Sequence, residues 1–354
     1  MRDGVELSAP GKAFLAGEYS VLQQGEPALV LAIEMRMHGT VRESRGRSVE
    51  LVHAPSGNAL RGEIDRERVM WGSGIPGDLR FAATAVGLAA RLCAEEGRDL
   101  RGFILTFQDD LSREGQKLGL GGSAAACVLA VRATCLAQGR ELTRDEVICL
   151  AAAAHSIEQG GRGSGADVAA CASGGLVEVR RRSTRWVQGQ NVTMRDLLSD
   201  PPLEVRPVTI PLGCRFLLAW TRRPADSRKL VEAVLQFSSA RPGRWQHHVR
   251  TLSTYETALR QGLERGDEAA SLDAVRRAAA GLGALGDEAQ VPIVTDELAH
   301  ACAIASSVGA AGKPSGAGGG DCAIVLAWRD AADRARKALE VAGYLVLEVA
   351  PAPP

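Results

Sequence analysis

The stretch KLGLGGSAAACVLAVRA, residues 117–133, constrains the fold more than any other part of this chain. It places Gly119, Gly121 and Gly122 directly before a run of small apolar residues, which predicts a helix. Glycines leave backbone N–H groups uncovered, and the first N–H groups of a helix have no partner inside that helix. The helix dipole adds a partial positive charge at the same place. The stretch is therefore either a flexible connection or a place where a negatively charged group lies against the backbone.

Three further glycine-rich stretches contain residue types that could carry chemistry: APGKAFLAGEY, QGGRGSGADVAA and KPSGAGGGDC. In the first, Lys12 enters a predicted strand, either as a solvated edge residue or as a cation for a phosphate. In the second, Asp167 follows a Gly-Ser-Gly turn, either stabilising that turn or orienting a hydroxyl proton. The third has four glycines in five positions, and they are costly to order. Close backbone contact with a ligand or another loop would explain that cost.

The composition argues against several classes of protein. Lys plus Arg and Asp plus Glu number 42 each, so no overall charge favours nucleic acid or an anionic membrane. The eight cysteines are scattered singly, without a C-x-x-C pair or a Cys/His cluster, which argues against a disulfide framework and a thiolate-bound metal. The charged N-terminal residues do not resemble a signal peptide, and no apolar run approaches the ~20 residues of a membrane span. We therefore expect a cytoplasmic protein that recognises any anion locally.

Strand-like and helix-like patterns are interleaved without strict regularity, which predicts an α+β fold. Residues 81–97 have helical periodicity and end on a glycine. A later helix is predicted to begin at Thr143, because Glu146 follows at the spacing of a capping box. His155 lies in this second helix. We expect it to be a core or capping residue, since the sequence pairs it with no serine or cysteine nucleophile.

The sequence also predicts two domains. Residues 183–203 are polar and end in prolines, which favours a connection between domains. One domain is therefore expected over residues 1–195 and the other over residues 196–354. The second is expected to start with the strands EVRPVTI and RFLLAWT and to continue with long amphipathic helices.

Together these motifs resemble those of the GHMP kinase superfamily, which includes galactokinases, homoserine kinases, mevalonate kinases and phosphomevalonate kinases. APGKAFLAGEYSVLQQGEPAL resembles the first family motif, KLGLGGSAAACVLA resembles the second, which cradles the ATP phosphates, and KPSGAGGGDCAIVLA resembles the third. The resemblance runs over essentially the whole chain. It implies an N-terminal domain like ribosomal protein S5 domain 2, a ferredoxin-like C-terminal domain, and an active site in the cleft between them.

Within the superfamily, the motifs most resemble the phosphomevalonate kinase branch. GEY at residues 17–19 and the run HSIEQGGRGSGADVAA are similar to that branch, and Lys117 stands where mevalonate kinases usually have a P-P-G-A lead-in. The implied reaction converts ATP and (R)-5-phosphomevalonate to ADP and 5-diphosphomevalonate. Mevalonate kinase is the nearest alternative. Diphosphomevalonate decarboxylase and a non-catalytic nucleotide-binding sensor also stay open.

The resemblance implies roles for individual residues. Lys12 and Asp167 would be catalytic, the lysine by bridging donor and acceptor charge and the aspartate by orienting or deprotonating the attacking phosphate oxygen. Ser123 would bind Mg²⁺, in place of the second of two serines that the family usually has there. The residues expected to bind ATP are Gly119, Leu120, Gly121, Gly122, Ser123 and Ala124. The residues expected to bind the acceptor are Lys117, Glu18, Tyr19, Arg162, Ser164, Gly165, Ser315, Gly316, Ala317 and Gly318.

The implied acceptor brings its own phosphate, whose second pKa is near ~6, so it is largely ionised at neutral pH. Cations that offset the repulsion between two anions therefore matter more than a general base. Lys117 is the expected cation for the acceptor phosphate. Glu158 is the nearest carboxylate for a second Mg²⁺ contact, but its spacing to Asp167 differs from the mevalonate kinase pattern. The expected partners are ATP, Mg²⁺ and a small phosphorylated acceptor, without nucleic acid or membrane, for a monomer or homodimer.

Overall fold

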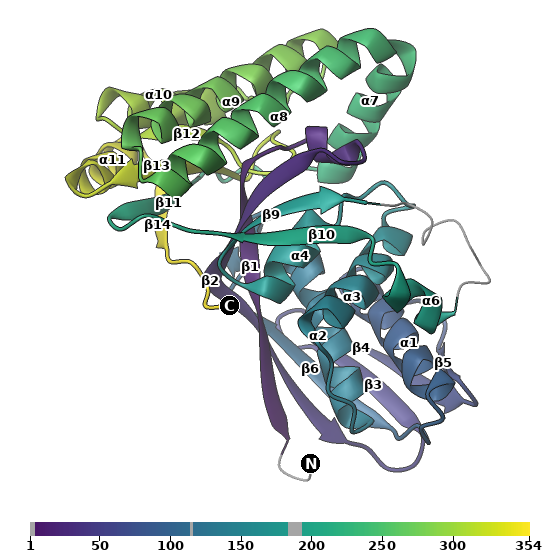
Figure 1. The fold of residues 1–354 in the computed structure, drawn as a ribbon. Coiled ribbons are helices and arrows are strands. Elements are labelled where there is room, and N and C mark those ends of the chain that lie inside the picture. Colours follow the sequence, from purple (N-terminus) through teal and green to yellow (C-terminus); the bar gives the residue numbers. More distant parts are fainter. Residues whose placement is uncertain (1–3, 114–115, 183–192) are drawn as a thin grey trace.

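A large mixed sheet forms the base of the N-terminal domain (Figure 1). The computed structural model describes residues 4–113, 116–182 and 193–354. The strand order is β10-β9-β2-β6-β3-β4-β5, with β1 paired to β2, and β3 runs parallel to β6. The strands are β1 (Val5–Ala16), β2 (Pro27–Glu43), β3 (Ser48–His53), β4 (Asn58–Asp65), β5 (Arg68–Trp71), β6 (Phe103–Asp109), β9 (Leu176–Arg181) and β10 (Leu203–Val208).

Helices α1 to α4 lie together on one side of this sheet, with α2 packed between its neighbours (Figure 1). α2 is buried almost all round, and it contacts α1, α3 and α4 as well as β1 and β2. A helix that is apolar on every side belongs in a core, which accounts for its Ala, Val, Leu and Cys residues. The helices of this domain are α1 (Arg80–Glu95), α2 (Gly122–Ala137), α3 (Arg144–Glu158), α4 (Ala166–Ser173) and α6 (Met194–Ser199).

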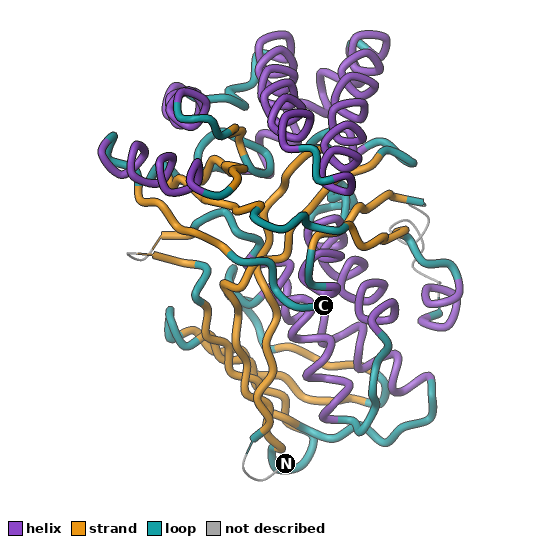
Figure 2. Tube along the Cα trace, turned by 60° about the vertical axis from the view of Figure 1, so that its left-hand side comes forward, coloured by secondary structure: helices purple, strands orange, loops and turns teal. Residues whose placement is uncertain are grey.

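The C-terminal domain is built on a four-stranded antiparallel sheet in the order β12-β13-β11-β14, with its helices gathered around it (Figure 2). Alternate residues of β11 face opposite sides, as the pleat of a strand requires. Leu217 packs with α10 and α11, whereas Phe216 belongs to the core shared with the N-terminal domain. The elements are β11 (Cys214–Trp220), β12 (Ala311–Pro314), β13 (Cys322–Trp328), β14 (Leu345–Val349), α7 (Ser227–Ala240), α8 (Pro242–Arg265), α9 (Glu268–Ala289), α10 (Asp296–Ser307) and α11 (Asp330–Val341).

The chain changes from the first sheet to the second after the predicted domain boundary, and its C-terminal tail returns to the first domain. β10 pairs with β9 in the first sheet, so the change of sheet falls between Val208 and Cys214 and not at residue 195. Two strands predicted to open the second domain, EVRPVTI and RFLLAWT, therefore lie in different sheets. The C-terminal tail returns to the first domain, where the Ala352 N–H donates to the Ala32 carbonyl at 2.9 Å. Long-range pairing, which local patterns do not encode, decides both features.

Predictions that depend on local signals are confirmed. The helix predicted over 81–97 is α1, and α3 begins after a Thr143 cap that exchanges hydrogen bonds with Glu146. Of the predicted connection over 183–203, residues 183–192 lie outside the described residues and Met194–Ser199 forms α6. No helix within the described part of the chain is both long and apolar enough to cross a membrane.

Candidate active site

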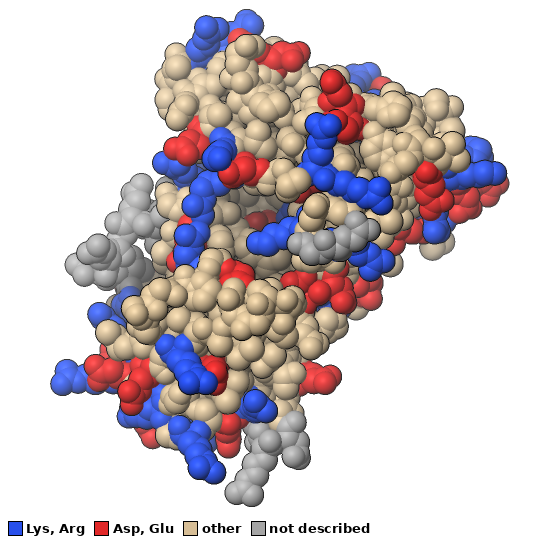
Figure 3. All heavy atoms as spheres, turned by 180° about the vertical axis from the view of Figure 1, so that it is seen from behind, with Lys and Arg blue, Asp and Glu red and all other residues tan. Residues whose placement is uncertain are grey.

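The glycine-rich stretches singled out in the sequence meet where the two domains face one another. The chain before α2 (residues 118–121, the α2 loop) lies against β1, because the Lys12 N–H donates to the Leu120 carbonyl at 2.8 Å. The chain before β13 (residues 315–321, the β13 loop) also contacts β1, where the Phe14 N–H donates to Ser315 Oγ at 3.0 Å. Figure 3 shows the molecule hollowed between its upper and lower halves, with lysine and arginine side chains on the rim of the hollow.

The α2 loop presents an open helix N-terminus. Gly119 and Gly121 have φ of 75° and 83°, in the left-handed region that favours glycine. Gly121 is the N-cap of α2, and no described side chain caps the helix there. The first N–H groups of α2 are therefore left for another acceptor, at the positive end of the helix dipole. This geometry is that of a phosphate site.

Lys12 lies directly against this loop. Its Nζ donates to the Gly119 carbonyl at 2.9 Å, and the side chain is only 7% exposed. A Cβ on Gly121 would lie 2.8 Å from Lys12 Cγ, so the glycine leaves room for the lysine stem. The structure thus brings a buried cation and an uncovered helix start together.

Asp167, Ser123 and His155 form a second cluster beside α2. Asp167 stands in the first turn of α4, where its Oδ1 accepts the Val168 N–H at 2.9 Å. His155 Nε2 lies 3.0 Å from Ser123 Oγ and 3.7 Å from Asp167 Oδ2. The prediction that no serine pairs with His155 is therefore wrong, because packing of α3 against α2 brings the two residues together.

Glu18 and Tyr19, predicted to bind the acceptor, have partners within the protein. Glu18 is 3% exposed and forms an ion pair with the fully buried Lys313. The Tyr19 hydroxyl donates to the Ala317 carbonyl at 2.6 Å. Burial, with the nearby Glu18 carboxylate, raises the pKa of Tyr19 well above its usual value, so the hydroxyl keeps its proton. The Tyr19 side chain thus holds the β13 loop to the β1–β2 connection, and the Glu18 side chain holds β12, which directly precedes that loop.

The remaining predicted acceptor residues are spread over three segments. Arg162 forms an ion pair with Glu232 of α7 at 2.9 Å, across the two domains. Ser164 Oγ accepts the Ala166 N–H at 3.3 Å, and Gly165 is the left-handed N-cap of α4. Lys117 is exposed on β8 (Gln116–Lys117), which pairs with β7 (Ser112–Arg113) just before the α2 loop.

Within the β13 loop, the glycines face protein more than open space. A Cβ on Gly318 would overlap the Ile293 carbonyl, and a Cβ on Gly320 would overlap the Arg223 carbonyl. A Cβ on Gly316, in contrast, would have no described atom within 4 Å. Among the predicted acceptor glycines of this loop, Gly316 is therefore the one with open space beside it.

Asp321, at the end of the β13 loop, was missed by sequence reasoning. It adopts a left-handed φ of 52°, and its Oδ1 accepts the Ala225 N–H at 3.2 Å. Its carboxylate lies against Gly119, where it blocks a side chain on that glycine. Burial raises the pKa of Asp321, and the Ala225 N–H and Lys12 partly offset that rise. An aspartate directly after three glycines was the available signal, since aspartate tolerates this conformation better than most residues.

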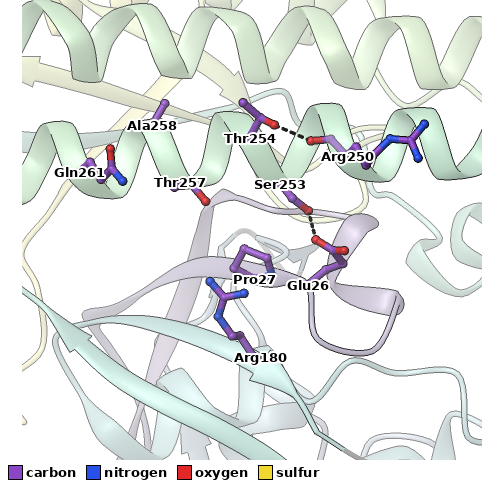
Figure 4. A pocket seen from close by; sticks show the side chains of 9 residues that line it. All are labelled: Glu26, Pro27, Arg180, Arg250, Ser253, Thr254, Thr257, Ala258 and Gln261. Atoms are coloured by element: carbon purple, nitrogen blue, oxygen red, sulfur yellow. Dashed lines mark hydrogen bonds between the residues drawn. The ribbon is translucent and has the colours of Figure 1, made fainter.

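Two further features of the structure carry no role in this site. Glu158 is paired with Arg80 at 2.6 Å and with Thr84 at 2.5 Å, so its carboxylate is already engaged. An open groove of about 540 Å³ lies between α8 and the β2–β9 edge, and it contains none of the residues of the site. Figure 4 shows the side chains that line it. The residues that line it are Glu26, Pro27, Arg180, Arg250, Ser253, Thr254, Thr257, Ala258 and Gln261.

Two α+β domains with an open helix N-terminus and a buried lysine between them form an arrangement suited to binding a phosphate group. Residues 83–175 match the model of the GHMP kinases N-terminal domain, and residues 259–344 match that of the GHMP kinases C-terminal domain. The chain belongs to the GHMP kinases. The two-domain α+β fold implied by the sequence resemblance is thereby confirmed.

Named relatives extend this comparison over nearly the whole chain. A phosphomevalonate kinase of Streptomyces sp. (strain CL190) is 31% identical, over 97% of this chain and 96% of its own length. A mevalonate kinase of Aeropyrum pernix is 27% identical, over 92% of this chain and 89% of its own. A solved structure of Streptococcus pneumoniae phosphomevalonate kinase in complex with phosphomevalonate and AMPPNP matches with a TM-score of 0.85 and 24% identity, covering 98% of this chain and 99% of that one.

Proposed function

We propose that this chain phosphorylates (R)-5-phosphomevalonate with ATP, giving ADP and 5-diphosphomevalonate. The observation that carries the choice of acceptor is the 31% identity to the Streptomyces phosphomevalonate kinase over 97% of the chain. The phosphoryl transfer itself is supported by the open N-terminus of α2 with Lys12 beside it. The protein would act in the cytoplasm as a monomer or homodimer.

The α2 loop would hold the ATP phosphates on the backbone N–H groups at the start of α2. Lys12 Nζ, 2.9 Å from the Gly119 carbonyl, stands where it can also meet a phosphate oxygen. Because phosphoryl transfer demands mostly positioning and charge neutralisation, a fixed cation at this point lowers the barrier without a covalent step. Asp167 would orient the attacking phosphate oxygen of the acceptor.

A magnesium ion fits the oxygen groups of this site. The Ser123 hydroxyl and the Asp167 carboxylate converge on the same nitrogen of His155, and Mg²⁺ is usually held by one or two protein oxygens together with substrate phosphates. Bound there, the ion would neutralise charge that develops on the transferred phosphoryl group. Glu158 would not take part, because Arg80 and Thr84 hold its carboxylate.

The acceptor phosphate needs cations of its own. Lys117 is exposed at the entrance to the α2 loop and would supply one. Arg162 would supply another only by exchanging Glu232 for the phosphate, since the two side chains are paired at 2.9 Å. Charge-assisted contacts of this kind would discriminate phosphomevalonate from mevalonate, which lacks the phosphate.

Phosphorylation of mevalonate is the second candidate, and the 27% identity to the Aeropyrum mevalonate kinase favours it. A coupled assay of ADP release against phosphomevalonate, mevalonate, homoserine and galactose separates the two. We expect turnover with phosphomevalonate and at most slow turnover with the others. Turnover with mevalonate alone would reject the proposed acceptor, release of CO₂ would indicate a decarboxylase, and nucleotide binding without turnover would indicate a sensor.

A further inference from the structure

His155 lies at the centre of the Ser123–Asp167 cluster, and the mechanism above gives it no part. It is 1% exposed, on α3, and reaches Ser123 on α2 and Asp167 on α4. Both partners face the same ring nitrogen, Nε2, at 3.0 Å and 3.7 Å. A hydrolytic triad places the serine on one ring nitrogen and the carboxylate on the other. The arrangement is therefore not that of a Ser-His-Asp hydrolase.

The surroundings of the ring favour a proton on Nε2. Nδ1 is buried, and no described group bonds to it. A buried N–H without a partner is costly, so a neutral ring keeps its proton on the nitrogen that has partners. The Nε2–H then donates to Ser123 Oγ and faces the Asp167 carboxylate. The opposite tautomer would turn a lone pair toward that carboxylate.

The hydrogen bond from His155 Nε2–H determines which lone pair of the Ser123 hydroxyl remains available to a ligand. A hydroxyl oxygen has two lone pairs and one proton. If one lone pair accepts from His155, the second lone pair and the proton remain for a metal ion or a phosphate oxygen. The imidazole itself is held in place, because it packs against the Phe81 ring with 5.0 Å between centroids.

We propose that His155 is a positioning residue, whose Nε2–H fixes the Ser123 hydroxyl, with Asp167 Oδ2 facing the same nitrogen at 3.7 Å. This inference rests on the proposed function, since it assigns Ser123 and Asp167 to one phosphoryl-transfer site. Misplacing a reacting group by about an ångström costs on the order of 100-fold in rate. Loss of the donor should therefore lower kcat while the binding of ATP changes little.

The experiment compares His155→Phe, which keeps a ring but removes the donor, with His155→Gln, whose Nε2 amide can donate from a similar position. We expect His155→Phe to lower kcat about 10- to 100-fold with KM for ATP within about threefold, and His155→Gln to recover most of the loss. Phe81→Leu is the control, because it disturbs the packing of the ring without removing the donor. Equal losses in His155→Phe, His155→Gln and Phe81→Leu would overturn the proposal in favour of a packing role.

A double-mutant cycle with Ser123→Ala tests the proposal even if His155→Phe folds poorly, since His155→Leu, which also removes the donor, can take its place. If the histidine acts through Ser123, adding the His155 change to Ser123→Ala should cost little more than Ser123→Ala alone. Independent, multiplicative losses would contradict it. Failure of the proposed function is seen separately, in a wild-type enzyme that ignores phosphomevalonate. The same cycle is then measured with the acceptor that the enzyme does use.

Discussion

The α2 loop and the β13 loop are both rich in glycine, but their glycines have different structural roles. In the α2 loop, left-handed Gly119 and Gly121 leave the start of α2 without a side-chain cap among the described residues. In the β13 loop, Gly318 and Gly320 let the chain lie directly on the carbonyls of other segments. One loop leaves backbone N–H groups uncovered at a helix start, whereas the other uses small residues to pack backbone on backbone. The same composition therefore does not define the same function.

The largest effect is expected at Lys313 of β12, directly before the β13 loop, whose ion pair with Glu18 ties this part of the chain to the β1–β2 connection. Lys313→Met would leave the Glu18 carboxylate buried without its partner. Removing one member of a buried pair typically costs about 3–5 kcal/mol of the free energy of unfolding. Denaturant unfolding should show this loss, and the double change Lys313→Met, Glu18→Gln should recover much of it. A stable variant with a raised acceptor KM would instead make the β13 loop a ligand loop.

The second-largest effect is expected at Asp167, which lies in the cluster beside α2. Asp167→Asn should lower kcat by ~10²-fold or more, because a positioned carboxylate contributes about that much. KM for ATP and the unfolding temperature should change little, since Asp167 Oδ1 makes a hydrogen bond to the Val168 N–H that an asparagine oxygen can also accept. Steady-state kinetics provides the measurement. Near-wild-type turnover would indicate that Asp167 only stabilises the turn.

A smaller effect is expected at Lys117, which carries the choice of acceptor. Removing one charge-assisted contact to a phosphate costs roughly 1.5–3 kcal/mol, or about 10- to 150-fold. Lys117→Ala should raise KM for phosphomevalonate by that factor and leave KM for ATP nearly unchanged. Arg113→Ala, on the paired strand β7, is the matched control for loss of a charge. If KM for ATP rises and KM for the acceptor does not, Lys117 belongs to the nucleotide site.

These residues also show which features of the fold and the site could be predicted from the sequence. The capping of α3 by Thr143 and the open start of α2 follow from signals within a few residues, and the structure has both. The Lys313–Glu18 pair spans 295 positions and the Ser123–His155 contact spans 32. Each depends on how distant elements cross, which no local pattern specifies. The contacts of Glu18 and Tyr19 in or beside the β13 loop could likewise not be predicted from their own stretch of sequence.

The most direct test of the difference between the two loops is a matched pair of glycine substitutions, Gly121→Ala and Gly318→Ala. Both glycines have left-handed φ, at 83° and 73°, so both alanines carry a similar backbone cost of about 1–2 kcal/mol. Gly121→Ala also meets Lys12 at the proposed phosphate site, whereas Gly318→Ala meets the Ile293 carbonyl.

Calorimetric titration with AMPPNP, with thermal unfolding measured in parallel, provides the readout for this pair. We expect Gly121→Ala to weaken nucleotide binding by about tenfold or more, which corresponds to about 1.4 kcal/mol. Gly318→Ala should lower the unfolding temperature further than Gly121→Ala does, while Kd for the nucleotide stays within about threefold. Weaker nucleotide binding by Gly318→Ala together with unchanged binding by Gly121→Ala would contradict the assignment of the α2 loop to ATP.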